Sequence, residues 1–125
     1  MTATLPYIKE MTIAMRVSDM SASIKWYTEV LGFELLYKLD DMGWAELKSS
    51  VPGVNVGISQ VEKVTPGGPT PTFGVSDINA ARATLEAQGV KFDGDTMVIP
   101  DMVKLATFYD PDGNSLMFFE SLSEM

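Results

Sequence analysis

The chain contains neither histidine nor cysteine among its 125 residues. The missing histidine excludes an imidazole general base, a histidine-dependent catalytic triad and an imidazole metal site. The missing cysteine excludes disulfides, thiolate metal ligands and a cysteine nucleophile. Any metal site must therefore be built from oxygen ligands, which suit Mg²⁺, Ca²⁺ or Mn²⁺ better than Zn²⁺, Fe²⁺ or Cu²⁺.

Positive charge is also scarce, because 9 lysines and arginines stand against 17 aspartates and glutamates, for a formal net charge of −8. This balance argues against nucleic acid or an anionic membrane as a partner, since both require a positive surface. A cationic or neutral small molecule is easier to accommodate. No apolar run approaches the roughly 18 residues of a membrane span, and Lys9 and Glu10 interrupt any signal-peptide core, so we expect a cytoplasmic protein.

A strand followed by a helix is predicted near the N-terminus. Residues 11–17 alternate between apolar and polar side chains, which is typical of a half-buried strand. The next segment places apolar residues at helical spacing, with Ser18 or Asp19 as the N-cap and Gly32 as a left-handed C-cap. Three further strands are expected within residues 33–39, 43–49 and 54–60.

The same order of elements then repeats. The triplet Val-Ser-Asp at 17–19 recurs at 75–77, and Gly32 is matched by Gly89 after a second predicted helix. We therefore expect one α+β domain, residues 1–125, made of two βαβββ modules at about 8–61 and 70–122, joined by a linker at about 62–69. Residues 93–101 are expected to form an irregular loop, either a lid or an ordinary surface loop.

Three segments carry a resemblance to a known family. They are RVSDMSASIKWYTEVLGFELL at 16–36, GVSDINAARATLEAQGV at 74–90 and FYDPDGNSLMFFE at 108–120. In this order and spacing the chain resembles the vicinal oxygen chelate superfamily, which includes glyoxalase I, extradiol dioxygenases and bleomycin-resistance proteins. The resemblance implies an eight-stranded, incompletely closed barrel-like sheet around a cleft for a small-molecule ligand, and a homodimer.

The resemblance also locates the metal positions of that superfamily. Metal-dependent members carry histidine on the first strand of each module and glutamate on the last strand. In this chain those positions hold Thr12, Gly57, Thr70 and Met117, none of which is a strong ligand for a hard divalent cation. We therefore expect no metal and no other cofactor at this site, although an oxygen-only metal site elsewhere in the cleft stays open.

Strand alternation predicts which side chains face the cleft. The expected ligand-binding residues are Thr12, Arg16, Trp44, Asn55, Ser59, Thr70, Thr72, Thr107, Met117 and Phe119. Glu46 and Tyr109 share this face and are the candidate catalytic residues. Two alternatives stay open for Arg16, which either holds a ligand carboxylate or pairs with Glu46 or another acid. Glu46 is a general base, the counter-ion of a cationic ligand, or a solvated or arginine-paired carboxylate.

Two classes of function follow from this site. The first is a metal-free small-molecule binding protein of the glyoxalase and bleomycin-resistance type, which holds a ligand in the cleft. The alternative is a metal-independent lyase, isomerase or cyclase on the same fold, with Glu46 or Tyr109 as acid or base. A metal-dependent glyoxalase or dioxygenase is a third and weaker hypothesis, because both chemistries depend on the metal.

Overall fold

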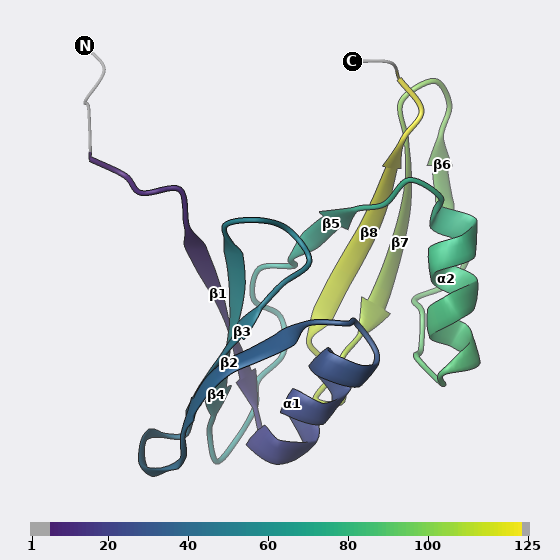
Figure 1. Cartoon of the computed structure of the whole chain (residues 1–125). Coiled ribbons are helices and arrows are strands. Elements are labelled where there is room, and N and C mark those ends of the chain that lie inside the picture. The colour runs from purple at the N-terminus through teal and green to yellow at the C-terminus, as the bar shows by residue number, and fades with distance from the viewer. Residues whose placement is uncertain (1–5, 124–125) are drawn as a thin grey trace.

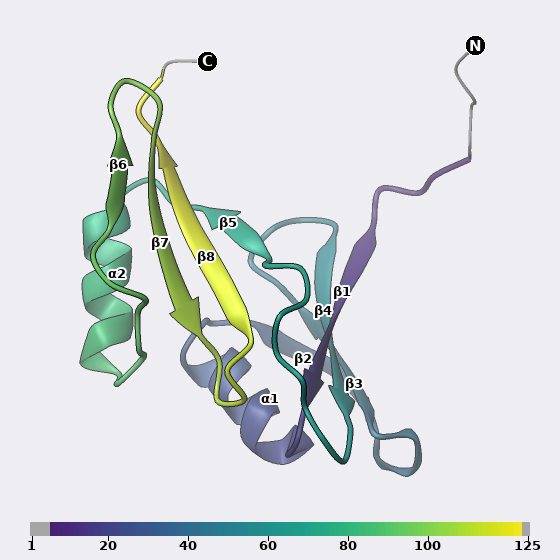
Figure 2. The same ribbon diagram turned by 180° about the vertical axis from the view of Figure 1, so that it is seen from behind.

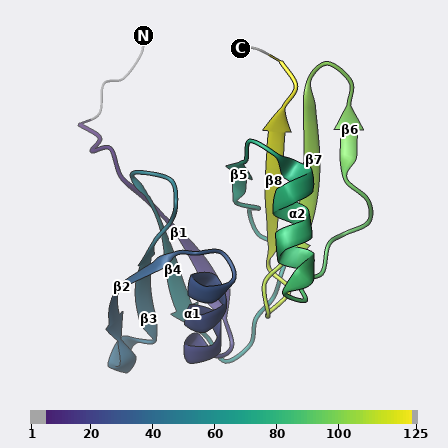
Figure 3. The same ribbon diagram turned by 45° about the vertical axis from the view of Figure 1, so that its right-hand side comes forward.

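Two four-stranded sheets, each covered by a helix on one face, form the computed structural model, which describes residues 6–123 (Figure 1). The first module contains β1 (Met11–Val17), α1 (Met20–Glu29), β2 (Glu34–Leu39), a 3₁₀ turn (Asp40–Met42), β3 (Trp44–Lys48) and β4 (Val54–Gln60). The second contains β5 (Thr72–Gly74), α2 (Ile78–Ala87), β6 (Met97–Ile99), β7 (Val103–Tyr109) and β8 (Ser115–Ser121). Both helices lie on the same side of the molecule (Figure 3).

The two sheets repeat one topology. Their strand orders are β1-β4-β3-β2 and β5-β8-β7-β6. The first strand of each module pairs in parallel with the last, and the remaining pairs are antiparallel. No hydrogen-bonded ladder joins the two sheets within residues 6–123, so the eight strands form an open arrangement. The predicted α+β fold with duplicated βαβββ modules is confirmed.

Local sequence signals account for the helix boundaries. The Asp19 carboxylate accepts a hydrogen bond from the Ala22 N–H at 3.1 Å, and Asp77 accepts one from Ala80 at the same distance. Such N-caps satisfy backbone donors that have no partner inside the helix. Beyond the helix ends Gly32 and Gly89 adopt φ angles of 76° and 83°, a conformation that glycine reaches without a steric cost.

The segment predicted as an irregular loop instead contains a strand. Residues 97–99 form β6, an edge strand that pairs antiparallel with β7, so the prediction of a wholly irregular loop was wrong. The preceding residues are fixed against α2, because Arg82 donates to the Gly94 carbonyl at 2.7 Å and to Thr96 at 3.1 Å. The aspartates, Gly94 and Pro100 around this apolar triplet indicate turns, so the sequence pattern did not predict the strand.

The modules meet along a seam that continues the hydrophobic core. The buried Tyr27 hydroxyl donates to Asp110 Oδ2 at 2.8 Å, and the Phe33 and Phe73 rings lie 5.8 Å apart between centroids. The Asn114 side chain donates to the Arg16 carbonyl at 2.8 Å. The linker between β4 and β5 runs between the two sheets (Figure 2). These contacts therefore fix the helix-free face of one sheet relative to that of the other.

Candidate functional site

One carboxylate gathers polar side chains on the helix-free face of the first sheet, which we call the module-one face. Glu46 is only 8% exposed. Its Oε2 atom accepts hydrogen bonds from Thr12 at 2.8 Å and from the Asn55 amide at 3.1 Å. Its Oε1 atom accepts from the Trp44 indole N–H at 3.2 Å and from the Tyr37 hydroxyl at 3.5 Å. Each of the four strands thus contributes one donor to the same carboxylate.

Strand register explains how these side chains meet. Thr12 on β1 pairs with Asn55 on β4, while Glu46 on β3 lies beside Gly57 on β4. Alternating residues of neighbouring strands point to the same face of a sheet, so Trp44 and Glu46 project together with Thr12 and Asn55. The sequence pattern therefore placed these four residues on the correct common face.

Tyr37 is a member of the site that the sequence did not reveal. Leu35 on β2 lies opposite the buried Leu47, so regular alternation would place Tyr37 on the core side as well. A register shift between Leu35 and Tyr37 brings Tyr37 opposite Glu46 instead. A bulge of this kind re-aims the following side chain. The segment ELLYKL contains no glycine or proline that would indicate the bulge.

The Trp44 ring lies against Gly57, one of the positions at which the resemblance places a metal ligand. A Cβ atom on Gly57 would lie 2.0 Å from Trp44 Cη2 and 2.3 Å from Cζ2, so the indole lies directly on the glycine backbone. No side chain fits at position 57 while the ring stays there. With Thr12 already donating to Glu46, the two positions of this module do not fit a divalent metal ion.

The carboxylate at the centre of this face has no cationic partner. The ion pairs within residues 6–123 are Lys38 with Asp40 and Arg82 with Glu86, so Arg16 does not pair with Glu46. The Asn55 amide that donates to Glu46 also lies 3.4 Å from a Glu10 carboxylate oxygen. The Asn55 amide therefore lies between two carboxylates. Only neutral donors stabilise Glu46, which is the buried one of the two.

The predicted residues of the second module form a separate group on the other sheet. Thr70 precedes β5, and its hydroxyl lies 2.8 Å from that of Ser115. The Thr72 hydroxyl donates to the Thr70 carbonyl at 3.0 Å and contacts Met117 Sδ at 3.8 Å. In the sheet Met117 pairs with both Thr72 and Thr107. These residues make no hydrogen bond to the Glu46 cluster in the described part of the chain.

Phe119 forms a second contact between an aromatic ring and a glycine. A Cβ atom on Gly74 would lie 2.8 Å from Phe119 Cζ, so this ring covers β5 much as Trp44 covers β4. Tyr109 lies elsewhere, in a cavity of about 250 Å³ with Trp26 and Lys91. The two predicted catalytic residues, Glu46 and Tyr109, are therefore not brought into one pocket.

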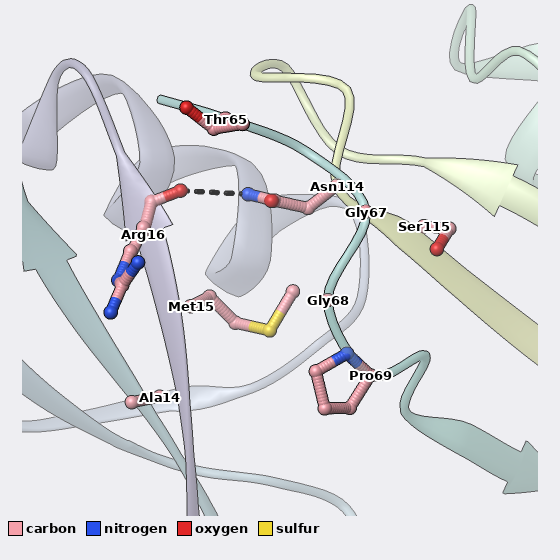
Figure 4. A pocket seen from close by; sticks show the side chains of 9 residues that line it. All are labelled: Ala14, Met15, Arg16, Thr65, Gly67, Gly68, Pro69, Asn114 and Ser115. Carbon is pink, nitrogen blue, oxygen red and sulfur yellow. Dashed lines mark hydrogen bonds between the residues drawn. The ribbon is translucent and has the colours of Figure 1, made fainter. Parts of the chain in front are cut away.

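A further cavity lies between β1 and the linker. It measures about 310 Å³ and is lined by β1, by the linker and by the turn before β8 (Figure 4). Met15 extends across it toward the linker near Gly68, whereas the Arg16 guanidinium points away from the linker (Figure 4). Ser59 lies in register with Arg16 and Trp44 on the neighbouring strand. Arg16 therefore lies along the module-one face without contacting its carboxylate.

No group of three or more histidine, cysteine, aspartate or glutamate side chains within residues 6–123 is arranged to hold a metal ion. None of the helices in that range is long and apolar enough to cross a membrane.

Comparison with known proteins identifies the family. Residues 11–118 match the model of the Glyoxalase/Bleomycin resistance protein/Dioxygenase superfamily, and the chain belongs to this superfamily. No curated protein matches the sequence.

Solved structures show the same fold. A superfamily member from Sphaerobacter thermophilus is 24% identical, with a TM-score of 0.81 over 94% of this chain and 100% of the other. An integron cassette protein from the Halifax Harbour sewage outfall metagenome is 25% identical, with a TM-score of 0.77 over 89% and 97%. TnmS3, an antibiotic binding protein from a Streptomyces species, is 23% identical, with a TM-score of 0.78 over 94% and 99%.

Proposed function

We propose that this protein is a metal-free small-molecule binding protein that holds its ligand against the module-one face. The observation that carries the proposal is the Trp44 ring lying on Gly57, where it offers an aromatic surface in place of a metal ligand. Hydrogen bonds fix this ring through Glu46, which Thr12 and Asn55 hold in turn. A rigid aromatic wall beside a few oriented polar groups is the usual composition of a small-molecule site.

The structural relatives are consistent with a binding role. TnmS3 is described as an antibiotic binding protein and has the same fold as this chain. A second copy would complete the site, because the module-one face and the group formed by Thr72, Met117 and Phe119 lie on different sheets of one chain. We propose a homodimer in which the second sheet of one chain covers the module-one face of its partner.

A metal-independent enzyme is the second candidate function. The Glu46 Oε1 atom receives only long hydrogen bonds, at 3.2 and 3.5 Å, and so keeps capacity to accept a substrate proton. Tyr109 lines a different cavity, and Tyr37 is the tyrosine that reaches this carboxylate. In an enzyme of this kind Glu46 would act as the general base and Tyr37 would be its partner.

Mass spectrometry of the purified protein tests the binding function. We expect a bound small molecule to co-purify with the wild type and to be lost from Trp44→Ala, because the substitution removes the aromatic wall. Tyr109→Phe is the matched control and should retain the molecule, since Tyr109 lines the other cavity. Retention of the same molecule by Trp44→Ala would contradict this location of the site.

Two further readouts of the same preparation separate the classes of function. Elemental analysis should find no stoichiometric Mn²⁺, Mg²⁺ or Fe²⁺, and a full equivalent of any of them would contradict the metal-free proposal. The co-purified molecule is then returned to the protein and recovered after incubation. Recovery of the unchanged molecule supports binding, whereas a product that forms with the wild type but not with Glu46→Gln supports the enzyme.

A further inference from the structure

We propose that Oε1 of Glu46 binds a cationic N–H donor on a planar ligand, whose conjugated system stacks on Trp44 while Tyr37 yields its place on the carboxylate. This inference rests on the proposed small-molecule binding function and adds the chemical class of the ligand. That class is a planar amidinium, guanidinium or protonated heteroaromatic amine.

Charge balance is the first argument for a cation. Glu46 is nearly buried, and its partners Thr12, Asn55, Trp44 and Tyr37 are all neutral donors. Taking a carboxylate out of water without a cation is costly, and neutral hydrogen bonds offset only part of that cost. The neighbouring Glu10 carboxylate, reached through Asn55, adds a second negative charge at the same point. A ligand cation would relieve both.

The two oxygens of Glu46 are unequally occupied, which identifies the ligand-facing atom. Oε2 holds two bonds of ordinary length, at 2.8 and 3.1 Å, and these fix the orientation of the carboxylate. Oε1 holds the longer contacts to Trp44 and Tyr37. A charge-assisted N–H···O⁻ bond is shorter and roughly twice as strong as a neutral one, so a cationic donor displaces the 3.5 Å Tyr37 contact.

Exposure and its place on an edge strand make Tyr37 the donor that yields. It lies on the edge strand β2, directly after the bulge, and its side chain is 48% exposed. Trp44, in contrast, is half-buried, and the outer edge of its ring packs against Gly57. Because an aromatic face attracts cations as well as other aromatic rings, a planar cation would contact Trp44 and Glu46 together.

Three probes of one shape test the proposal: benzamidine, which is a cation, benzamide, which is neutral, and benzoate, which is an anion. Binding is followed by Trp44 fluorescence in a Trp26→Phe background, which leaves Trp44 as the sole tryptophan of the chain. We expect benzamidine to bind at least 10-fold more tightly than benzamide and benzoate to bind most weakly. Equal affinity of benzamidine and benzamide would overturn the cationic ligand while leaving a small-molecule site on Trp44.

Variants locate the charge that selects the cation. Glu46→Gln should reduce the preference for benzamidine over benzamide to less than twofold, whereas Glu34→Gln, the same charge change at an exposed position of β2, should retain it. Tyr37→Phe should bind benzamidine at least as tightly as the unchanged chain. A Glu46→Gln protein that keeps the full preference overturns the assignment.

If Glu46→Gln does not fold, Glu46→Asp and the three-probe series with the unchanged chain still test the proposal. Glu46→Asp should keep a preference for the cation, and its loss there would overturn the proposal. Failure of all three probes to change Trp44 fluorescence also overturns the proposed ligand class. The co-purification experiment tests the binding function separately.

Discussion

At the scale of single residues, the contact between Trp44 and Gly57 shapes the module-one face. Residue 57 has no side chain, and the indole fills the space beside it. The absence of a side chain at residue 57 leaves room for the indole, whose N–H donates to Glu46. A side chain at position 57 could not be added without moving the ring.

Gly57→Ala should lower the free energy of unfolding by about 1–3 kcal/mol, because the new methyl group overlaps the indole and forces it to move. Urea denaturation measures the change, and near-UV circular dichroism reports the displaced ring. Gly68→Ala in the linker is the control and should stay within about 0.5 kcal/mol, since nothing lies within 4 Å of its added Cβ.

The double variant Trp44→Ala/Gly57→Ala tests the cause of that loss. If the clash with the indole is responsible, Gly57→Ala should cost much less in the Trp44→Ala background. Strictly additive losses would show that the glycine is required for another reason.

At the scale of elements, β6 depends on a turn that is strained at one residue. The Met102 N–H donates to the Ile99 carbonyl at 3.1 Å, which closes a four-residue turn with Pro100 second and Asp101 third. Asp101 has a φ angle of 63° and is the non-glycine residue with positive φ among residues 6–123. A turn with positive φ at its third residue favours glycine, so the sequence departs from the preferred choice here.

Asp101→Gly should therefore raise the free energy of unfolding by about 1 kcal/mol, because the gain from relieved strain exceeds the entropy that glycine adds to the unfolded chain. Thermal denaturation measures the change. Asp101→Ala should lower stability, since alanine tolerates this conformation less well than aspartate. Stabilisation by both substitutions would point to the lost negative charge instead of the backbone.

At the scale of the whole molecule, a buried hydrogen bond contributes to the seam between the modules. The Tyr27 hydroxyl on α1 donates to Asp110 at the end of β7, and Asn114 also donates to this carboxylate at 2.9 Å. Burial, together with the nearby Asp110 charge, raises the pKa of Tyr27 well above its ordinary value of 10.0. The folded protein therefore holds this proton more tightly than the unfolded chain does.

Alkaline pH should weaken the seam for that reason. The stabilisation is complete below about pH 10 and is lost as the pH rises further, by about 1.4 kcal/mol per pH unit, because the unfolded chain releases the proton first. Urea denaturation at pH 10 and 11 measures the slope. Tyr27→Phe should be less stable at pH 7 by about 1–2 kcal/mol and should lack this part of the slope.

Tyr7→Phe is the control for that experiment, because Tyr7 is 83% exposed, and it should follow the wild type. An unchanged slope in Tyr27→Phe would show that other groups cause the alkaline loss of stability.

Sequence patterns predicted much of this protein because they record short-range requirements. Alternation in β1, the caps Asp19 and Asp77 and the glycines after each helix reflect local sterics and hydrogen bonding, and their repetition revealed the two modules. The common face of Thr12, Trp44, Glu46 and Asn55 followed from alternation within regular strands. The sequence also showed threonines and a glycine at the positions where the resemblance places metal ligands.

Only the tertiary structure decided which of these residues contact one another. The bulge in β2 that turns Tyr37 toward Glu46, the pairing of β6 with β7 and the separation of Tyr109 from Glu46 depend on contacts between distant segments. Periodicity cannot encode such contacts, because it describes one strand at a time, whereas register and bulges are fixed by packing across the sheet. The sequence determined the fold and the residue types at each strand position, and packing across the sheet decided that Trp44 lies against Gly57 beside Glu46.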